Sequence, residues 1–451
     1  MSKINKIPTV IIFNIAETFA NFLEKSSDPQ KREELINGEA YLGDRALLWG
    51  GDPKLAIVSY PIAHSEIIKN RLNYPQTTYR YPQHTTNQLS LDIIRDPGLL
   101  EAIANYAGEN RSLQIIPYAT TPEFLSLITI LRENYQLSVE TPESPNHDHL
   151  WIRDLVDTKA GFRQLVSQWL PDADRFLPPG FICYHSKQAA DAAFWFYQRG
   201  KACLVKANTG ENGIGIFIIR PDVPITVEEI NKKIEDDTYY TDDLIVVEEC
   251  IPATKQNSPS LELFVPHPKR GKPEITYLSK QLFLEFGDFC GIEVSKNLQQ
   301  EKWFPDLERC GILIAHKLQD LGYVGHFDLD CIISDDEKLY LLEINSRRTG
   351  GTHVHDLAYH IIGPDYIDNT SLLSFEAMDS GRINSAGELI NLLAEFLYPI
   401  NKEHIGLVIT VTTTLKYHRF GCLTIAPTPG EALILQKQIA QKISEHSRLS
   451  H

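Results

Sequence analysis

The sequence lacks the features that mark membrane-spanning and nucleic-acid-binding proteins. It contains no apolar run of about 18 residues or more, so we expect no helix that spans a bilayer. Lysine and arginine are not clustered, and the formal net charge is -16. Binding to nucleic acid or to an anionic membrane needs grouped positive charge, so neither is expected as a main partner.

Cysteine patterns that would indicate disulfides or zinc are also missing. The seven cysteines form no CxxC pair, and several lie within apolar runs, which indicates reduced core thiols in a cytoplasmic protein. Residues 1–16 carry two lysines before a short apolar run and so resemble a signal peptide. Asn14 interrupts that run, and an amphipathic segment follows at 17–25. We therefore expect a first strand and a first helix there.

Two common nucleotide-binding signatures are absent as well. The chain has no GxxxxGK[ST] pattern, and no GxGxxG follows a strand and opens a helix. Its 451 residues suffice for two or three packed units, and 43% hydrophobic with 23% charged residues is typical of a soluble protein.

Hydrophobic periodicity divides the chain into segments. Residues 1–150 alternate strand-like and helix-like runs, which predicts an α/β layer. A polar stretch with Pro142 and Pro145 predicts a boundary near residue 150. Toward the end, strands are expected at 407–414 and 421–426, followed by a helix at 431–444.

The most informative stretch is 326–356. Alternating residues at 326–333 and 339–345 flank a polar segment, which predicts a β-hairpin with a four-residue loop. In that register Asp330 faces Glu343, with Cβ atoms about 5 Å apart. The second run is expected to place four residues on one face: Leu339, Leu341, Glu343 and Asn345.

These facing carboxylates predict a cation site. Two carboxylates at the ends of apolar strands repel unless a cation lies between them, and Mg²⁺ with oxygen ligands is the natural candidate. Arg347, Arg348 and the Gly350-Gly351 pair follow directly and would suit a phosphate group. An acidic surface hairpin is the alternative interpretation.

Two further segments carry candidate binding residues. Lys206 lies in an apolar strand, and a loop with Gly210, Gly213 and Gly215 follows it. Backbone amides of such a loop can approach phosphate oxygens, although glycine turns between strands are common without any ligand. The stretch 244–252, LIVVEECIP, is an apolar strand that ends in two glutamates before a proline, as a hinge between lobes would.

The order of these motifs resembles the ATP-grasp superfamily, in which two α+β lobes hold MgATP. The motifs are a lysine strand with a glycine loop, an acidic hinge, and D-x12-E-x-N-x-R. SPSLEL, EINSRRTGGTH and GCLTIAPTPGEA are similar to pheganomycin-type peptide ligases. That resemblance implies a pre-ATP-grasp α/β domain at 1–150, an ATP-grasp domain at 151–375 and a C-terminal α+β domain at 376–451. It places the nucleotide lobe at about 178–252 and the metal-site lobe at about 253–375.

The resemblance also implies roles for individual residues. Contacts with the ATP phosphates are implied for Lys159, Lys206, Gly210, Gly213 and Gly215. Contacts with adenine are implied for Glu248, Glu249 and Ile251, and with the ribose for Glu262. Magnesium ligands are implied at Asp330, Glu343 and Asn345, and Arg347 is implied near the transferred phosphoryl group.

The chain departs from the superfamily pattern at Asp328, where some amide ligases carry arginine. Arg347 or Arg348 would then stabilise the tetrahedral intermediate, while Asp328 orients the metal ligands or is simply solvated. Arg348 is a candidate for a substrate carboxylate or, alternatively, for a surface salt bridge. Three histidines follow, and the first could contact an amine substrate or serve as a cap or core residue: His353, His355 and His360.

The resemblance implies an ATP-dependent carboxylate-amine ligase that forms an amide or peptide bond through an acyl phosphate and releases ADP and phosphate. Its substrates would be an amino acid or small carboxylic acid and an amine. A non-catalytic nucleotide-binding regulatory module is the alternative. Thiol ligation or cofactor carboxylation ranks lower, because no biotin-attachment motif or CoA-type domain is visible. The extension after His360 could form a contact in a homo-oligomer.

Overall fold

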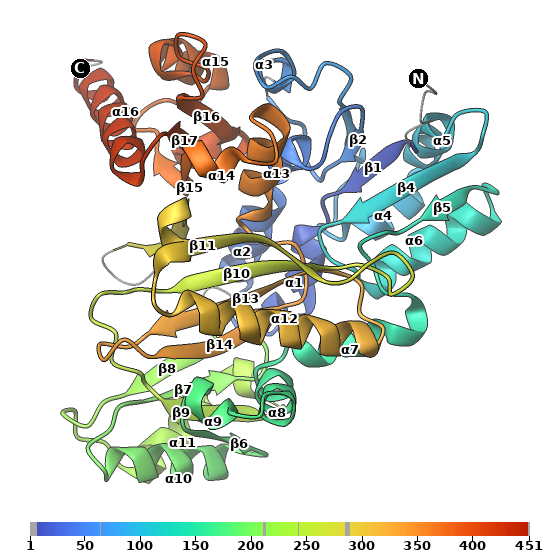
Figure 1. Cartoon of the computed structure of the whole chain (residues 1–451). Helices are drawn as coiled ribbons and strands as arrows, with labels where there is room; N and C mark the ends of the chain where they lie inside the picture. The colour runs from blue at the N-terminus through green and yellow to red at the C-terminus, as the bar shows by residue number, and fades with distance from the viewer. Residues whose placement is uncertain (1–6, 64, 211–212, 242, 285–288, 450–451) are drawn as a thin grey trace.

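The computed structural model describes residues 7–63, 65–210, 213–241, 243–284 and 289–449. Three sheets organise them (Figure 1), ordered β3-β2-β1-β4-β5, β6-β9-β7-β8 and β14-β13-β10-β11-β12-β15-β17-β16. We call these the N-terminal, small and large sheets. The fold is α/β in its N-terminal part and α+β beyond it, as the sequence predicts. A search of the described helices for a bilayer-spanning segment finds none.

The N-terminal sheet is parallel throughout. Its central strand is buried on both faces, as apolar runs in parallel sheets are. Its strands are β1 (Thr9–Ile12), β2 (Leu55–Ile57), β3 (Thr78–Arg80), β4 (Ser112–Pro117) and β5 (Ser138–Glu140). Its helices are α1 (Ile15–Leu23), α2 (Pro29–Ala40), η1 (Gly43–Leu48), α3 (Ser65–Arg71), α4 (Leu89–Arg95), α5 (Pro97–Tyr106) and α6 (Pro122–Glu133).

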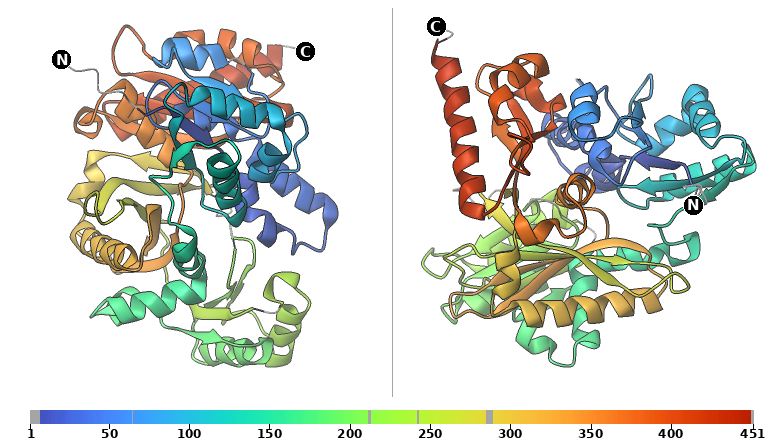
Figure 2. Two further views of the ribbon diagram at one scale, coloured as in Figure 1. Left: turned by 90° about the vertical axis from the view of Figure 1, so that its right-hand side faces the viewer. Right: turned by 45° about the horizontal axis from the view of Figure 1, so that its top comes forward.

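The small sheet is antiparallel and lies at the end of the molecule away from the N-terminal sheet (Figure 1; Figure 2, left). The connection to it contains η2 (His147–His149), α7 (Leu150–Val156), α8 (Lys159–Trp169) and α9 (Ala173–Phe176). Its strands are β6 (Gly180–Cys183), β7 (Cys203–Ala207), β8 (Ile216–Ile219) and β9 (Ile245–Glu249). It carries α10 (Ser186–Tyr197), α11 (Val227–Glu235) and η3 (Thr238–Tyr240).

The large sheet joins the middle of the chain to its C-terminal segment. Its strands are β10 (Pro259–Val265), β11 (Glu274–Phe283), β12 (Phe289–Val294), β13 (Gly325–Ile333), β14 (Leu339–Asn345), β15 (Ser371–Asp379), β16 (Gly406–Val411) and β17 (Arg419–Ala426). The helices are η4 (Lys296–Gln300), α12 (Phe304–Asp320), α13 (Thr352–Ile361), α14 (Tyr366–Asn369), α15 (Ala386–Leu392), η5 (Ala394–Phe396), η6 (Thr413–Tyr417) and α16 (Pro429–Leu449). The boundary expected at residue 375 falls inside β15, so the C-terminal strands extend this sheet rather than form another.

The β13–β14 hairpin pairs Asp330 with Glu343, as predicted, but by a different route. Five residues rather than four separate the two strands, and the register shifts at Leu342, which has no partner. The additional loop residue and the β-bulge compensate for each other, so the carboxylate pair is retained. The bulge also corrects the predicted face, because Leu341 now lies in the apolar core while Glu343 lines a cavity.

The two faces of the large sheet differ in chemistry. One face packs on α12 and α8 through a buried cluster that includes Leu261, Phe327 and Leu329. Residues that pair directly across strands share a face, so the opposite face gathers polar side chains. Asp330 pairs with Ser260 and Glu343, and Asp328 pairs with Glu262 and Asn345. This polar face carries the candidate site.

Candidate functional site

A cavity of about 320 Å³ lies over the polar face of the large sheet. Its volume is at the lower end of the range of about 300–1,000 Å³ for small-molecule sites. The lining combines residues of the N-terminal part, the glycine loop, strands β10–β12, the hairpin with the segment after it, and β15. Six of the predicted site residues belong to it: Gly210, Gly213, Asp330, Glu343, Asn345 and Arg347.

The predicted metal ligands lie together at the base of this cavity. Asp330 accepts hydrogen bonds from Asn345 Nδ2 at 3.0 Å and Gln281 Nε2 at 2.7 Å. Burial raises the pKa of Asp330, and the nearby charge of Glu343 raises it further. Burial and the charge of Asp330 raise the pKa of Asp328 well above its usual range, and Asp328 Oδ1 is buried without a hydrogen-bond partner among the described residues. These carboxyl groups are therefore harder to ionise than exposed ones, because too little positive charge lies beside them.

Lys159 supplies the nearest positive charge. Its Nζ lies 2.6 Å from Glu343 Oε2, and although burial opposes it, the charge of Glu343 raises the pKa of this lysine. The same contact outweighs burial and lowers the pKa of Glu343. Lys159 opens α8, whose first backbone amides donate to Asn208 O and Oδ1 at 2.9 and 3.0 Å. Asn208, which follows β7, thus attaches the start of α8 to the base of the glycine loop.

Arg347 is held over the cavity by the N-terminal part of the chain. Its guanidinium lies 4.9 Å from the centre of the Phe19 ring and 5.7 Å from that of Tyr118. It donates to Asn345 Oδ1 at 3.1 Å and to Tyr118 Oη at 3.3 Å. A fixed positive charge therefore stands beside the carboxylates, as the sequence predicts.

The lysine and acidic residues of the small sheet form ion pairs with one another. Lys206 Nζ contacts Glu248, and Arg163 Nη1 lies 3.6 Å from the same carboxylate. Glu249 pairs with Lys201 at 2.7 Å. None of these residues, nor Gly215 or Ile251, lines the cavity. Their proposed nucleotide contacts stay predictions, and residues 211–212 of the glycine loop lie outside the described residues.

The ribose contact predicted for Glu262 stays a prediction, because the structure buries its side chain among protein partners. Its side chain is 0% exposed and accepts hydrogen bonds from Thr352 at 2.6 Å and Tyr277 at 3.1 Å, with His326 Nδ1 at 3.0 Å. Burial opposes ionisation, yet the hydrogen bond and charge of His326 lower the pKa of Glu262. Glu262 therefore joins strand β10 to α13 and presents no surface to a ligand.

The catalytic or substrate-binding role predicted for Arg348 also stays a prediction, because the structure pairs its side chain with protein carboxylates. Arg348 is 5% exposed and donates to both oxygens of Glu143 at 2.8 Å and to Asp356 Oδ2 at 3.0 Å. Its guanidinium also lies 4.8 Å from the centre of the Trp49 ring. All these partners are protein groups, so Arg348 ties the hairpin to the N-terminal part of the chain.

The three histidines after the hairpin differ in burial. His353 is 2% exposed, and burial with the charge of Arg45 lowers its pKa well below the usual range. His355 contacts Tyr366 Oη at 3.0 Å, and His360 contacts Asn73 O at 2.8 Å. Burial favours the core alternative for His353, while His355 and His360 are partly exposed and contact protein groups.

Several cavity residues were not anticipated from the sequence. Ser260, Ser279 and Gln281 line it from β10 and β11, where alternation of polar residues along each strand was the available signal. Glu39, Arg45 and Glu376 line it from α2, η1 and β15. No local pattern indicated these three, because they meet only through tertiary packing.

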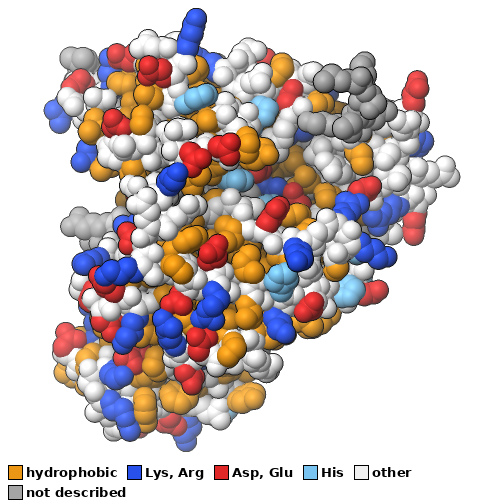
Figure 3. Space-filling model, viewed as in Figure 1, with side chains coloured by type: hydrophobic (Ala, Val, Ile, Leu, Met, Phe, Trp, Pro, Cys, Tyr) orange, Lys and Arg blue, Asp and Glu red, His pale blue; other side chains and the backbone are white. Residues whose placement is uncertain are grey.

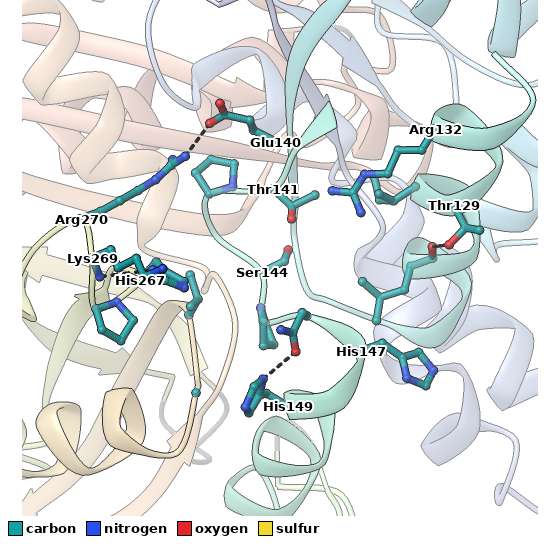
Figure 4. Close-up of a pocket in the computed structure, with 18 of the residues that line it drawn as sticks. Thr129, Arg132, Glu140, Thr141, Ser144, His147, His149, His267, Lys269 and Arg270 are labelled. Carbon is teal, nitrogen blue, oxygen red and sulfur yellow. Dashed lines mark hydrogen bonds and ion pairs between the residues drawn. The ribbon is translucent and has the colours of Figure 1, made fainter. Parts of the chain in front are cut away.

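A larger cavity of about 1160 Å³ lies between α6, β5 and the β10–β11 connection, and none of the predicted site residues lines it. Figure 4 shows Arg270 reaching across it to Glu140, at 2.8 Å. Its charged groups are spread along exposed walls, and on the face shown in Figure 3 acidic and basic side chains are interspersed. We therefore assign the chemistry to the smaller cavity, where charged side chains converge.

Comparison with solved structures identifies the fold. Biotin carboxylase from Campylobacter jejuni, in a complex with an ATP analogue, aligns over 95% of this chain and 90% of its own at 14% identity and a TM-score of 0.58. N5-carboxyaminoimidazole synthetase from Staphylococcus aureus, complexed with ADP, aligns over 97% and 98% at 11% identity and a TM-score of 0.52. N5-carboxyaminoimidazole synthase from Aspergillus clavatus, solved with ADP and 5-aminoimidazole ribonucleotide, aligns over 98% of this chain and 99% of its own at 8% identity and a TM-score of 0.53.

At these identities the likeness shows a shared fold, the ATP-grasp fold. No protein-family model matches the sequence. No curated protein matches it either.

Proposed function

We propose that this protein is an ATP-dependent carboxylate-amine ligase. Its sequence motifs resemble those of peptide ligases and so favour a peptide bond as the product. The observation that carries the proposal is that Asp330, Glu343, Asn345 and Arg347 line one cavity. Lys159 lies against Glu343 at 2.6 Å. A site for nucleotide affinity alone does not need such a set of charges. The protein shares its fold with enzymes that were solved with bound ADP, which supports the proposal that it binds ATP.

The residues at the cavity base fit a magnesium ion. Mg²⁺ is usually bound through one or two carboxylates together with substrate phosphates. Two carboxylates and an amide oxygen are present, and the described residues hold no cluster of three or more His, Cys, Asp or Glu that would form an all-protein metal site. Burial and neighbouring carboxylates disfavour ionisation of Asp328 and Asp330, and a bound cation would favour their ionised forms. Asp330, Glu343 and Asn345 would hold the ion, which would neutralise phosphate charge.

The protein's own groups would act mainly by position and charge. Transfer of the γ-phosphoryl group of ATP to a carboxylate oxygen gives an acyl phosphate and ADP. An amine nitrogen then attacks the carbonyl carbon, the bond from carbon to the phosphate oxygen breaks, and phosphate and a proton leave. Lys159 and Arg347 would offset negative charge on the moving phosphoryl group and on the tetrahedral intermediate. Glycines 210 and 213 would bring backbone amides to the phosphates.

The test is to supply the purified chain with MgATP and pools of amino acids, small acids and amines. ADP release is followed by a coupled assay, and condensed products are sought by mass spectrometry. We expect ADP formation that depends on an acid and an amine, with a product of the combined mass less water. ATP binding without substrate-dependent ADP from any pool would instead support the regulatory module.

A further inference from the structure

A second group of charged residues lines the cavity apart from the hairpin. Arg45 is 4% exposed, and its Nη1 lies 2.9 Å from Glu376 Oε1. Glu39 lines the same cavity, and among the described residues its carboxylate has no hydrogen-bond or ion-pair partner within contact distance. These residues come from η1, β15 and α2, so packing of the N-terminal part against the large sheet creates the group.

This group offers a ligand both a hydrogen-bond donor, on Arg45, and a carboxylate acceptor, on Glu39. Arg45 pairs with Glu376, but its buried Nε has no hydrogen-bond partner among the described residues. Glu39 makes no direct ion pair among the described residues, and the more distant charges of Arg45 and Arg347 only partly offset its burial. A buried ionic group without its full set of partners is costly, so such an arrangement indicates a ligand that completes it. Burial and the charge of Glu376 raise the pKa of Glu39 to about 7, which agrees with a carboxylate short of positive charge.

Apolar side chains surround the group. Leu42, Phe289 and Ile292 line the same cavity. A Cβ added to Gly350 would lie 2.8 Å from Glu376 Oε1 and 3.8 Å from Phe289 Cε1, so the glycine lets the carboxylate and the ring approach the backbone closely. A ligand here would place its ammonium group near carboxylates and its carbon skeleton against an apolar wall.

We propose that Glu39, Glu376 and Arg45 bind a zwitterionic amino acid, with its ammonium group at the two glutamates and its carboxylate on the side of Arg45 and Arg347. The inference rests on the proposed ligase and narrows its carboxylate substrate from small acids in general to amino acids. Arg347 lines the same cavity and carries the charge needed beside a carboxylate that receives a phosphoryl group. A simple acid would bring no ammonium group to Glu39, and a simple amine would bring no acceptor to the buried Nε of Arg45.

The experiment compares three matched sets of probes on the full chain. Protein amino acids, the same acids without the amino group, and the same amines without the carboxylate are tested by ligand-observed saturation-transfer NMR and by ADP release. The variants are Glu39→Gln and Glu376→Gln, with Glu33→Gln as control, an exposed glutamate of α2. The carboxylate of Glu39 forms no hydrogen bond or ion pair with the residues that the structure describes, so its variant should fold even if the Glu376 variant is impaired.

We expect only amino acids to bind and to trigger ADP release. Each site variant should weaken amino-acid binding by about tenfold or more, because a buried charge pair is lost, while the affinity for MgATP stays unchanged. ADP release with simple acids that is insensitive to Glu39→Gln would overturn the inference and leave the ligase proposal standing. Amino-acid binding that depends on Glu39, with no ADP release, would reject the ligase and keep the binding site. Binding of no amino acid would overturn the inference.

Discussion

Substitution of Arg348 by methionine is expected to destabilise the fold rather than weaken substrate binding. The change preserves much of the side-chain bulk but removes the charge that bonds both oxygens of Glu143 and one oxygen of Asp356. Removing one partner from a buried ion pair costs about 3–5 kcal/mol. With Arg348 5% exposed, we expect a loss of that size in the free energy of unfolding.

The loss should depend on pH in a defined direction. Burial alone raises the pKa of Asp356, but the charge of Arg348 outweighs it and lowers the pKa below its usual value. The wild-type chain therefore gains stability from Asp356 above the ordinary carboxyl pKa of about 4 and loses it in more acid solution. Without Arg348 burial dominates, so the variant carboxyl takes up a proton more readily. The stability difference should be largest near neutral pH and shrink toward pH 4.

Urea unfolding followed by circular dichroism at several pH values measures this difference. Arg309→Met is the control, because Arg309 is 42% exposed and its pairing with Asp172 at 3.1 Å should contribute less than about 1 kcal/mol. An Arg348→Met chain as stable as wild type, with a raised KM for the acid substrate, would refute the structural role and support the predicted substrate contact.

The remaining predictions concern the cavity and two buried lysines, Lys206 and Lys54. Glu343→Gln should abolish ATP turnover with an unchanged circular dichroism spectrum, and normal turnover would remove this residue from the metal site. Lys206→Ala should weaken ATP binding in calorimetry at least tenfold, whereas Lys201→Ala, which removes a half-exposed ion pair, should not. Burial lowers the pKa of Lys54 from 10.5 to about 7, a difference worth about 5 kcal/mol. Between pH 7 and pH 10 the Lys54 ammonium keeps its proton in the unfolded chain but loses it in the folded chain. The free energy of unfolding of the wild-type protein should therefore rise with pH over this interval, and Lys54→Met should lack this rise. Amino-acid affinity should increase as pH rises through about 7 and Glu39 ionises, and Glu39→Gln should flatten that profile.

Local patterns predicted the elements of the hairpin and the pairing of Asp330 with Glu343. Alternation along two strands, with a polar loop between them, restricts the register strongly. Local patterns could not reveal the bulge at Leu342. A five-residue loop with a bulge pairs Asp330 with Glu343 just as a four-residue loop without a bulge would. The predicted strand face of Leu341 was wrong for this reason.

The sequence by itself determined the order of the motifs, the α/β and α+β segments, and the carboxylates and Arg347 that converge on the cavity. Tertiary structure decided which charged residues face that cavity. Glu262 and Arg348 lie close to the site in sequence but are buried against partners, while Glu39, Arg45 and Glu376 are distant in sequence and line it. The physical reason is that periodicity sets which face of a strand a side chain occupies, whereas exposure depends on the surfaces that pack over that face.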